Sequence, residues 1–230
     1  VMREWLDDFV SLFYPKSCFV CQRSLNTQEK LICLHCQAKL PCCNYHLDST
    51  NPIVKKFWGR LPIEFASAFL KFSKGNATQQ LLHALKYEGE EEIGDWLGKM
   101  YGTILAKCAF ISRFDAVIPV PLHPQKEKIR GYNQCNGFAR QLALALKAEA
   151  LLNTVKRTVF TVSQTKQSRL GRFANVSNIF QVAEPLKLQG KHVLLVDDVI
   201  TTGATVEACG NVVLQNGAKK LSVVAIAFAE

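Results

Sequence analysis

The sequence predicts an α/β protein built on an open, mostly parallel β-sheet flanked by helices, with a small cysteine-rich module before it. The first observation is the apolar run Val193–Val196, which does not alternate and is typical of a parallel strand covered on both faces. An acidic pair, a small-residue loop and a helical pattern follow it. The second observation is another strand, loop and helix between residues 114 and 147. The third is the clustering of six of the nine cysteines before residue 44.

Residues 1–17 are expected to form an amphipathic helix that docks on the body of the protein or on a partner, because their large apolar side chains fall on one side of a helix. Asp7 and Asp8, without a basic start or a small-residue cleavage site, argue against a secretory signal. No apolar run reaches the roughly 18 residues that a membrane-spanning helix needs. We therefore expect a cytoplasmic protein with no membrane span.

Residues 18–45 are expected to form a zinc ribbon-like module. Two Cys-x-x-Cys motifs, separated by eleven residues, place four thiols for tetrahedral Zn²⁺: Cys18, Cys21, Cys33 and Cys36. The segment has few apolar residues, so the metal would supply folding free energy. Disulfides, which are unexpected in a cytosolic chain, and an iron–sulfur cluster are the alternatives. Cys42-Cys43 is either a degenerate second motif or a pair without a role.

Residues 46–61 are polar and contain Asn51-Pro52 and Gly59, which predicts a linker before a main domain over residues 62–230. The domain is expected to begin with a strand over Glu64–Phe72 and two helices. The first helix starts at Gly75-Asn76 and ends near Gly89, and the second spans about residues 90–107.

The next strand, Phe114–Val120, ends in a run of prolines. Proline cannot extend a central strand, so Pro119, Pro121 and Pro124 mark the carboxyl end of this strand, where open α/β sheets bind their ligands. A basic loop and a helix over Cys135–Lys147 follow. The remaining expected elements are strands at Thr154–Val159, Phe180–Val182, Lys191–Val196 and Leu221–Phe228 and a helix at Ala204–Gln215.

Positive charge is concentrated in the middle of the chain. Between Pro121 and Asn175 there are ten Lys or Arg and two acids, which accounts for +8 of the net charge of +9. A solvated basic face is the simplest explanation, and a site for pyrophosphate, phosphate or nucleic acid is the functional one. Aromatic residues are not interleaved as a surface that stacks single-stranded bases requires, so phosphate ligands are favoured. Within this region the polar segment 161–175 is either disordered or a lid.

The loop after the acidic pair Asp197-Asp198 predicts an anion site. Backbone N–H groups at a helix N-terminus favour a phosphate, Gly203 allows close approach, and the threonine hydroxyls add donors. The residues of this loop are Thr201, Thr202, Gly203, Ala204 and Thr205. The two carboxylates suit the vicinal hydroxyls of a ribose or a Mg²⁺ carried with the ligand. An ordinary crossover with surface aspartates is the alternative.

The stretch Val196–Thr205 resembles the phosphoribosyl-pyrophosphate signature of type I phosphoribosyltransferases, and nearly the whole chain resembles the ComF/GntX family. The motifs that carry the second resemblance are the four cysteines, Lys86-Tyr87, Pro119-Val-Pro-Leu-His, Arg130-Gly-Tyr-Asn-Gln, Gln164 through Arg172 and Asn175 to Phe180, and Val196–Thr205. Family members often carry a further cysteine pair, and here only Cys42-Cys43 stands in its place.

The resemblance implies a type I phosphoribosyltransferase-like fold, with hood elements over 62–110 and a core over 111–230. It implies phosphoribosyl pyrophosphate with Mg²⁺ as the ligand, bound by Asp197, Asp198 and residues 201–205. The implied pyrophosphate-binding residues are Leu122, His123, Arg130 and Gly131, and the implied catalytic residues are Asp197, Asp198 and Arg172. Segment 161–175 would be the lid. A link to competence and DNA uptake, and a homodimer, are also expected.

Two functions remain open from the sequence. The protein is either a phosphoribosyltransferase with an unknown acceptor, or a non-catalytic module that binds a phosphoribosyl ligand or single-stranded DNA in a competence complex. A fold alone does not decide between them. No nucleobase-recognising residue is evident, which slightly favours the second function or an unfamiliar acceptor.

Overall fold

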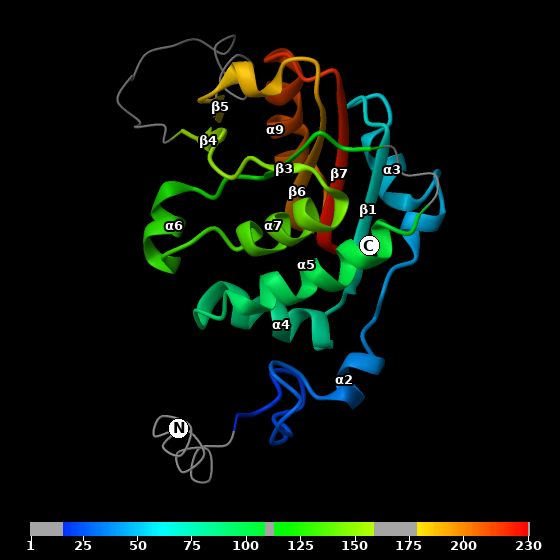
Figure 1. Ribbon diagram of the computed structural model, residues 1–230, viewed down its shortest axis with the longest axis vertical. Helices are drawn as coiled ribbons and strands as arrows, with labels where there is room; N and C mark the ends of the chain where they lie inside the picture. Colours follow the sequence, from blue (N-terminus) through cyan, green and yellow to red (C-terminus); the bar gives the residue numbers. More distant parts are fainter. Residues whose placement is uncertain (1–15, 109–112, 159–178, 230) are drawn as a thin grey trace.

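A computed structural model describes residues 16–108, 113–158 and 179–229 (Figure 1). Nearly all of the amphipathic helix expected over residues 1–17 lies outside the described residues. The expected lid over 161–175, with Arg172, also lies outside them. Within the described residues no helix is long and apolar enough to cross a membrane.

The described domain is built around a five-stranded sheet with the order β1-β7-β6-β2-β3, in which every neighbouring pair of strands is parallel. The strands are β1 (Phe65–Phe72), β2 (Ala116–Pro119), β3 (Glu149–Ala150), β6 (His192–Ile200) and β7 (Lys220–Ala229). This confirms the expected open parallel sheet. Because β6 is the central strand, the acidic pair lies in the middle of the sheet's carboxyl edge.

Helices cover both faces of the sheet (Figure 1). They are α2 (Leu34–Ala38), α3 (Pro52–Phe57), α4 (Ala77–Tyr87), α5 (Glu92–Leu105), α6 (Pro124–Arg130), α7 (Cys135–Leu146) and α9 (Ala204–Gln215), with 3₁₀ turns η1 (Tyr45–Leu47) and η3 (Pro185–Leu188). Along β6, Leu194 and Val196 belong to the apolar cluster under α4, α5 and α7, whereas Val193 and Leu195 belong to the cluster under α3 and α9. Both faces of β6 are therefore buried, which explains its unbroken apolar run.

Helices α5 and α7 pack with their backbones nearly in contact. A Cβ placed on Gly98 would lie 2.7 Å from the backbone oxygen of Phe138, and one on Gly102 would lie 2.7 Å from Cβ of Ala145. Only glycine fits such an approach without displacing the partner helix. The close packing fixes α7, whose first turn lies next to the acidic pair.

A separate two-stranded antiparallel pair consists of β4 (Val155–Arg157) and β5 (Phe180–Val182). Both strands were expected, β5 with the same bounds. Val155, Phe180 and Val182 are buried in the same cluster as α3 and α9.

Three local expectations were wrong. Strand β6 does not end before Asp197 but continues to Ile200, because its backbone keeps parallel register with β7 as far as Phe228. The basic loop after Pro121 contains helix α6, which His123 caps, which begins with Pro124 and which ends at the left-handed Gly131. Both end signals are favourable for a short helix.

The third wrong expectation is that residues 46–61 are loop-like. This segment contains α3, whose Ile53 and Phe57 are fully buried. Asn51, itself only 1% exposed, caps the helix by accepting from the backbone N–H groups of Ile53 and Val54. Its amide nitrogen donates to three backbone oxygens, including that of Ala66 in β1. The segment is thus part of the domain core, although most of its exposed residues are polar.

Cys42 and Cys43 lie where the cysteine module meets the sheet. The backbone N–H of Cys43 donates to the backbone oxygen of Phe69 at 2.7 Å, and the backbone N–H of Lys71 donates to that of Pro41 at 2.7 Å. Between them, Cys42 forms an antiparallel bridge with Leu70. Cys43 is buried and Cys42 is exposed, as alternation along an extended segment requires. This pair therefore belongs to a short segment that covers the outer edge of β1.

Candidate functional site

The acidic pair stands at the carboxyl end of the central strand and is partly buried. Oδ1 of Asp197 accepts from the backbone N–H of Asp198 at 2.8 Å, and Oδ1 of Asp198 accepts from that of Val199 at 2.6 Å. These bonds fix both carboxylates in orientation. Burial and the charge of Asp198 raise the pKa of Asp197 from 3.8 to about 8.

Residues from two other helices converge on Asp198. The Lys86 ammonium at the end of α4 lies 2.5 Å from Oδ2 of Asp198, and Nε2 of Gln134 donates to the same oxygen at 3.0 Å. Gln134 in turn accepts from Arg130 at 2.7 Å, and the Arg130 guanidinium lies over the ring of Tyr87 at 5.2 Å. Arg130 is therefore joined to the acidic pair through one side chain. Lys86 and Gln134 were not among the predicted site residues, although both lie inside motifs that carry the family resemblance.

The predicted phosphate loop lies at the N-terminus of α9. Gly203 is left-handed (φ 78°) and buried, whereas Thr201, Thr202, Ala204 and Thr205 are exposed. These four residues are thus open to a ligand beside the helix N-terminus, which favours an anion.

The segment after Asn51 packs against this loop and holds it through Phe57 and Arg60. A Cβ on Gly203 would lie 2.8 Å from the ring of Phe57, so the loop rests directly on α3. Arg60 donates to the backbone oxygen of Thr202 at 3.0 Å and to Oε2 of Glu207 at 3.1 Å. Neither Phe57 nor Arg60 was predicted, because their segment was expected to be a linker.

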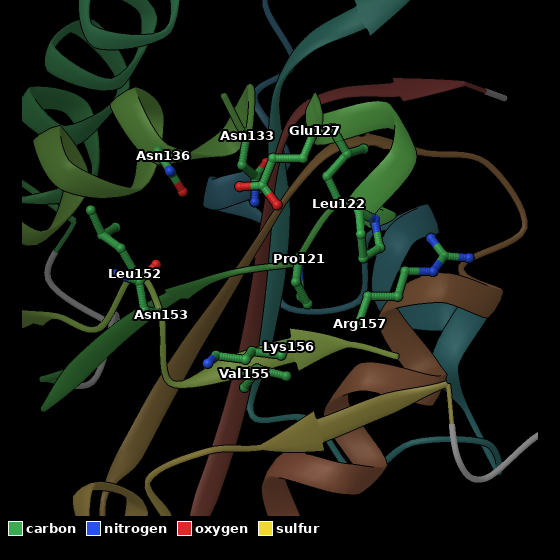
Figure 2. A pocket seen from close by; sticks show the side chains of 11 residues that line it. Pro121, Leu122, Glu127, Asn133, Asn136, Leu152, Asn153, Val155, Lys156 and Arg157 are labelled. Carbon is green, nitrogen blue, oxygen red and sulfur yellow. The ribbon is translucent and has the colours of Figure 1, made fainter. Parts of the chain in front are cut away.

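The predicted pyrophosphate-binding residues are not all in one place. Nδ1 of His123 accepts from the backbone N–H of Gln125 at 3.3 Å, so this ring caps α6. Arg130 joins the acidic pair at the other end of α6, and Gly131 is exposed with φ 84°. Leu122 lines a separate hollow between Pro121, the start of α7 and β4 (Figure 2).

That hollow is lined by both charges and amides, including Glu127, Lys156, Arg157, Asn133 and Asn136 (Figure 2). Oδ1 of Asn136 is buried and accepts no hydrogen bond in the described part of the chain. The hollow adjoins the end of β2 on its β3 side, whereas Asp198 lies on the β6 side.

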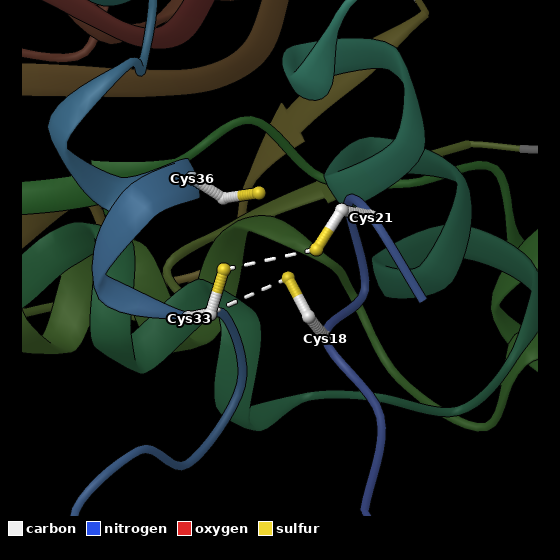
Figure 3. A group of neighbouring side chains, drawn as sticks. All are labelled: Cys18, Cys21, Cys33 and Cys36. Carbon is white, nitrogen blue, oxygen red and sulfur yellow. Dashed lines mark hydrogen bonds between the residues drawn. The ribbon is translucent and has the colours of Figure 1, made fainter. Parts of the chain in front are cut away.

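The four predicted metal ligands do meet. Sγ atoms of Cys18, Cys21, Cys33 and Cys36 all lie within 4.8 Å of one another and point to a common centre (Figure 3). The Cys21–Cys33 sulfur distance is 3.7 Å, which matches the roughly 3.8 Å edge of a tetrahedron with Zn–S bonds of about 2.3 Å. The backbone N–H of Cys33 points to Sγ of Cys18 at 3.3 Å. The cluster is therefore compatible with a structural zinc.

The cysteine module packs on α4, the helix that carries Lys86. Phe19 and Gln22 share one surface hollow with Gln79 and His83 of α4 and with Glu88, which follows the helix. Cys18, Cys33 and Cys36 belong to the same apolar cluster as Leu81, Leu82 and Leu85. One helix therefore packs against the cysteine module and also carries the lysine that pairs with Asp198.

Comparison with known proteins shows which proteins this chain resembles. The phosphoribosyl transferase domain family matches residues 133–229. DNA utilization protein YhgH of Shigella flexneri is 31% identical over 213 residues, which cover 90% of this chain and 87% of that protein. Competence protein F of Haemophilus influenzae is 36% identical over 116 residues, 50% of this chain and 51% of that protein. Competence protein ComFC of Bacillus subtilis is 23% identical over 148 residues, 64% of this chain and 57% of that protein.

Proposed function

Because the chain belongs to the ComF family of phosphoribosyltransferase-like proteins, we propose that it binds phosphoribosyl pyrophosphate with Mg²⁺ and transfers the phosphoribosyl group to an acceptor. The observation that carries the proposal is the position of the paired carboxylates. Asp197 and Asp198 lie near the carboxyl end of the central strand β6, which runs to Ile200 and is followed directly by the loop at the N-terminus of α9. A ribose bound by the carboxylates would have its 5′-phosphate at that loop.

Each group of residues has a role in this proposal. Asp197 and Asp198 hold the ribose hydroxyls, and residues 201–205 hold the 5′-phosphate. Arg130, which is joined to the acidic pair through Gln134, would contact the leaving diphosphate with Gly131, and Arg172 would add a charge. His123 and Leu122, the other two expected contacts, lie at the opposite end of α6 and beside a separate hollow. As the acceptor bonds to C1′, the bond from C1′ to the diphosphate oxygen breaks, and the cationic side chains stabilise the charge on the leaving group.

The two carboxylates could bind Mg²⁺ only together with the phosphate groups of the ligand, not as a metal site of the protein alone. Three of their oxygens already accept hydrogen bonds or an ion pair from Asp198, Val199 and Lys86. Mg²⁺ is commonly held by one or two carboxylates together with substrate phosphates rather than by an all-protein cage. Asp197 and Asp198 would hold the metal together with the ligand, and its positive charge would offset part of the charge on the diphosphate.

The cysteine cluster is proposed to hold one structural Zn²⁺. Backbone hydrogen bonding at Arg23 lowers the pKa of Cys21 to about 6, whereas burial raises the pKa of Cys36. A bound cation would bring all four thiols to the thiolate form that zinc requires. A reducing cytoplasmic location suits four free thiols.

The second candidate is a binding module for single-stranded DNA or a phosphoribosyl ligand in a competence complex. The names of the relatives, which refer to DNA utilization and competence, favour it. Trp58 is exposed and could stack on a base, and its neighbours in the sequence include the basic residues Lys55, Lys56 and Arg60.

Calorimetry with phosphoribosyl pyrophosphate and Mg²⁺ tests the first candidate. Wild type should bind with micromolar affinity, and the double variant Asp197→Asn/Asp198→Asn should not bind. Failure of wild type to bind would remove the ligand assignment.

Release of pyrophosphate with candidate bases or amines would support the enzyme. A salt-dependent shift of single-stranded DNA that survives the aspartate changes would support the module, and light scattering would test the expected homodimer.

A further inference from the structure

The ion pair between Lys86 and Asp198 occupies the carboxylate that the proposed ligand needs. The lysine and aspartate side chains are 20% and 14% exposed, and the ammonium lies 2.5 Å from Oδ2. Gln134 donates to the same oxygen, so the protein itself already satisfies it. The site is therefore charge-neutralised from within by a side chain of α4.

Docking α4 onto the core does not require this ion pair. Leu81, Leu82 and Leu85 of the helix are almost fully buried, and the Tyr132 hydroxyl donates to the backbone oxygen of Leu85. Removing two charges from water offsets much of their attraction, so a partly buried pair adds little net stability. Packing of α4 therefore does not explain why Lys86 stands at the end of the helix, beside Asp198.

Lysine is suited to change partners. Its ammonium is a compact charge on a flexible four-carbon stem, and lysine commonly binds phosphate groups as a point charge. Lys86 pairs with Asp198, and Arg130 is joined to the same carboxylate through Gln134. A phosphate group bound near Arg130 would therefore be within reach of both cations.

We propose that Lys86 is a ligand-contacting residue that neutralises Asp198 in the free protein and transfers to the phosphate groups of the ligand when a divalent cation binds Asp198. This inference rests on the proposed phosphoribosyl site. It makes α4 a direct participant in ligand binding. It also requires that metal and anion bind cooperatively, because the anion supplies Lys86 with a new partner as the metal displaces it.

The test uses Mn²⁺ as a spectroscopic probe of the metal and pyrophosphate as the anion, on the full chain. Relative to wild type, Lys86→Met should bind Mn²⁺ alone about three- to tenfold more tightly, because the competing charge is gone. The same variant should bind pyrophosphate about tenfold more weakly and lose the cooperativity between the two ligands. Lys86→Arg should retain the pyrophosphate affinity.

Lys191→Met is the matched control, since Lys191 pairs with Glu149 at 2.6 Å near the opposite end of the sheet. It should change neither affinity. Unchanged Mn²⁺ and pyrophosphate affinities in Lys86→Met, or both affinities falling together with thermal stability, would overturn the exchange. No Mn²⁺ binding by wild type or by Lys86→Met would overturn it as well. Because Mn²⁺ is measured without phosphoribosyl pyrophosphate, failure of that ligand to bind leaves the result on Lys86 readable.

Discussion

The ring of Phe57 lies directly under Gly203: a Cβ on this glycine would be 2.8 Å from Cε1 of Phe57 and 3.0 Å from Cζ. Gly203 also has φ 78°, a conformation that other residues adopt with strain. The phosphate loop is therefore held in shape both by its own backbone and by a buried side chain from a segment about 145 residues earlier in the chain.

Gly203→Ala is expected to be more damaging than the same change at another left-handed glycine. Gly75 has φ 81° and no atom within 4 Å of the position that a Cβ would take, so Gly75→Ala should cost only the backbone strain of about 1–2 kcal/mol. Gly203→Ala should cost about 1–3 kcal/mol more, because Phe57 must move. Urea unfolding of both variants gives the difference, and equal losses would mean that Phe57 yields freely.

Arg60→Ala should weaken phosphoribosyl pyrophosphate binding about two- to tenfold, because the loop backbone at Thr202 would be less ordered before binding. The Arg60–Glu207 pair is partly exposed, so the free energy of unfolding should fall by less than about 1 kcal/mol. Lys187→Ala breaks another exposed pair, with Glu184, and serves as the control. Equal affinities of the three proteins would show that Arg60 does not support the loop.

The raised pKa of Asp197 predicts a pH dependence of stability. Since the folded protein holds this proton up to a pKa of about 8 and the unfolded chain releases it near 3.8, protonation stabilises the folded state. That contribution is complete below about pH 4 and is lost as the pH rises through 8, with a slope of at most about 1.4 kcal/mol per pH unit. Asp197→Asn should flatten the profile and be more stable than wild type at pH 8.

Asp48→Asn is a suitable control for this profile. Hydrogen bonds from the Thr50 backbone N–H and hydroxyl lower the pKa of Asp48, so this group titrates below the window. The slope between pH 5 and 8 should stay that of wild type in Asp48→Asn. A wild-type profile with no fall in this range would contradict the raised pKa.

Loss of the proposed zinc should weaken ligand binding, because α4 packs against the cysteine module and carries Lys86. Purified wild type should contain about one zinc per chain, as expected for one four-thiolate site. Cys33→Ser should lower the zinc content, the melting temperature and the affinity for phosphoribosyl pyrophosphate together, because Cys33 and the buried leucines of α4 share one cluster. Cys42→Ser, at an exposed cysteine, should alter none of them. A zinc content well below one would contradict the assignment, and full ligand affinity in Cys33→Ser would show that α4 holds its place without the module.

Long, periodic elements could be predicted from the sequence, whereas two short helices could not. The helix α9 was predicted with its observed bounds, because a loop of small residues precedes its apolar stripe and Asn216-Gly217 follows it. The helices α3 and α6 were missed because six or seven residues do not show a helical period. Asn51-Pro52 and His123-Pro124, a capping side chain followed by proline at the first helical position, were the signals that could have revealed them.

The acidic pair and the phosphate loop were accessible to sequence reasoning because they are contiguous. Lys86, Gln134 and Arg60 were not, because each reaches the site from an element that is distant along the chain. Nothing in the local sequence fixes which helix end meets which strand end, since that depends on the order of five parallel strands. The basic character of residues 121–175 did not indicate which cations lie beside the carboxylates.

The short segment around Cys42 has a consequence for how this protein can be divided. It pairs with β1 at Leu70 and thereby blocks the outer edge of the sheet. A protein shortened to residues 62–230 would lose this segment together with Ile53 and Phe57, and would leave unpaired N–H and C=O groups along β1. Open strand edges recruit other chains, so the shortened protein is expected to self-associate. The segment around Cys42 would then protect the protein against self-association, a role separate from that of the proposed zinc site.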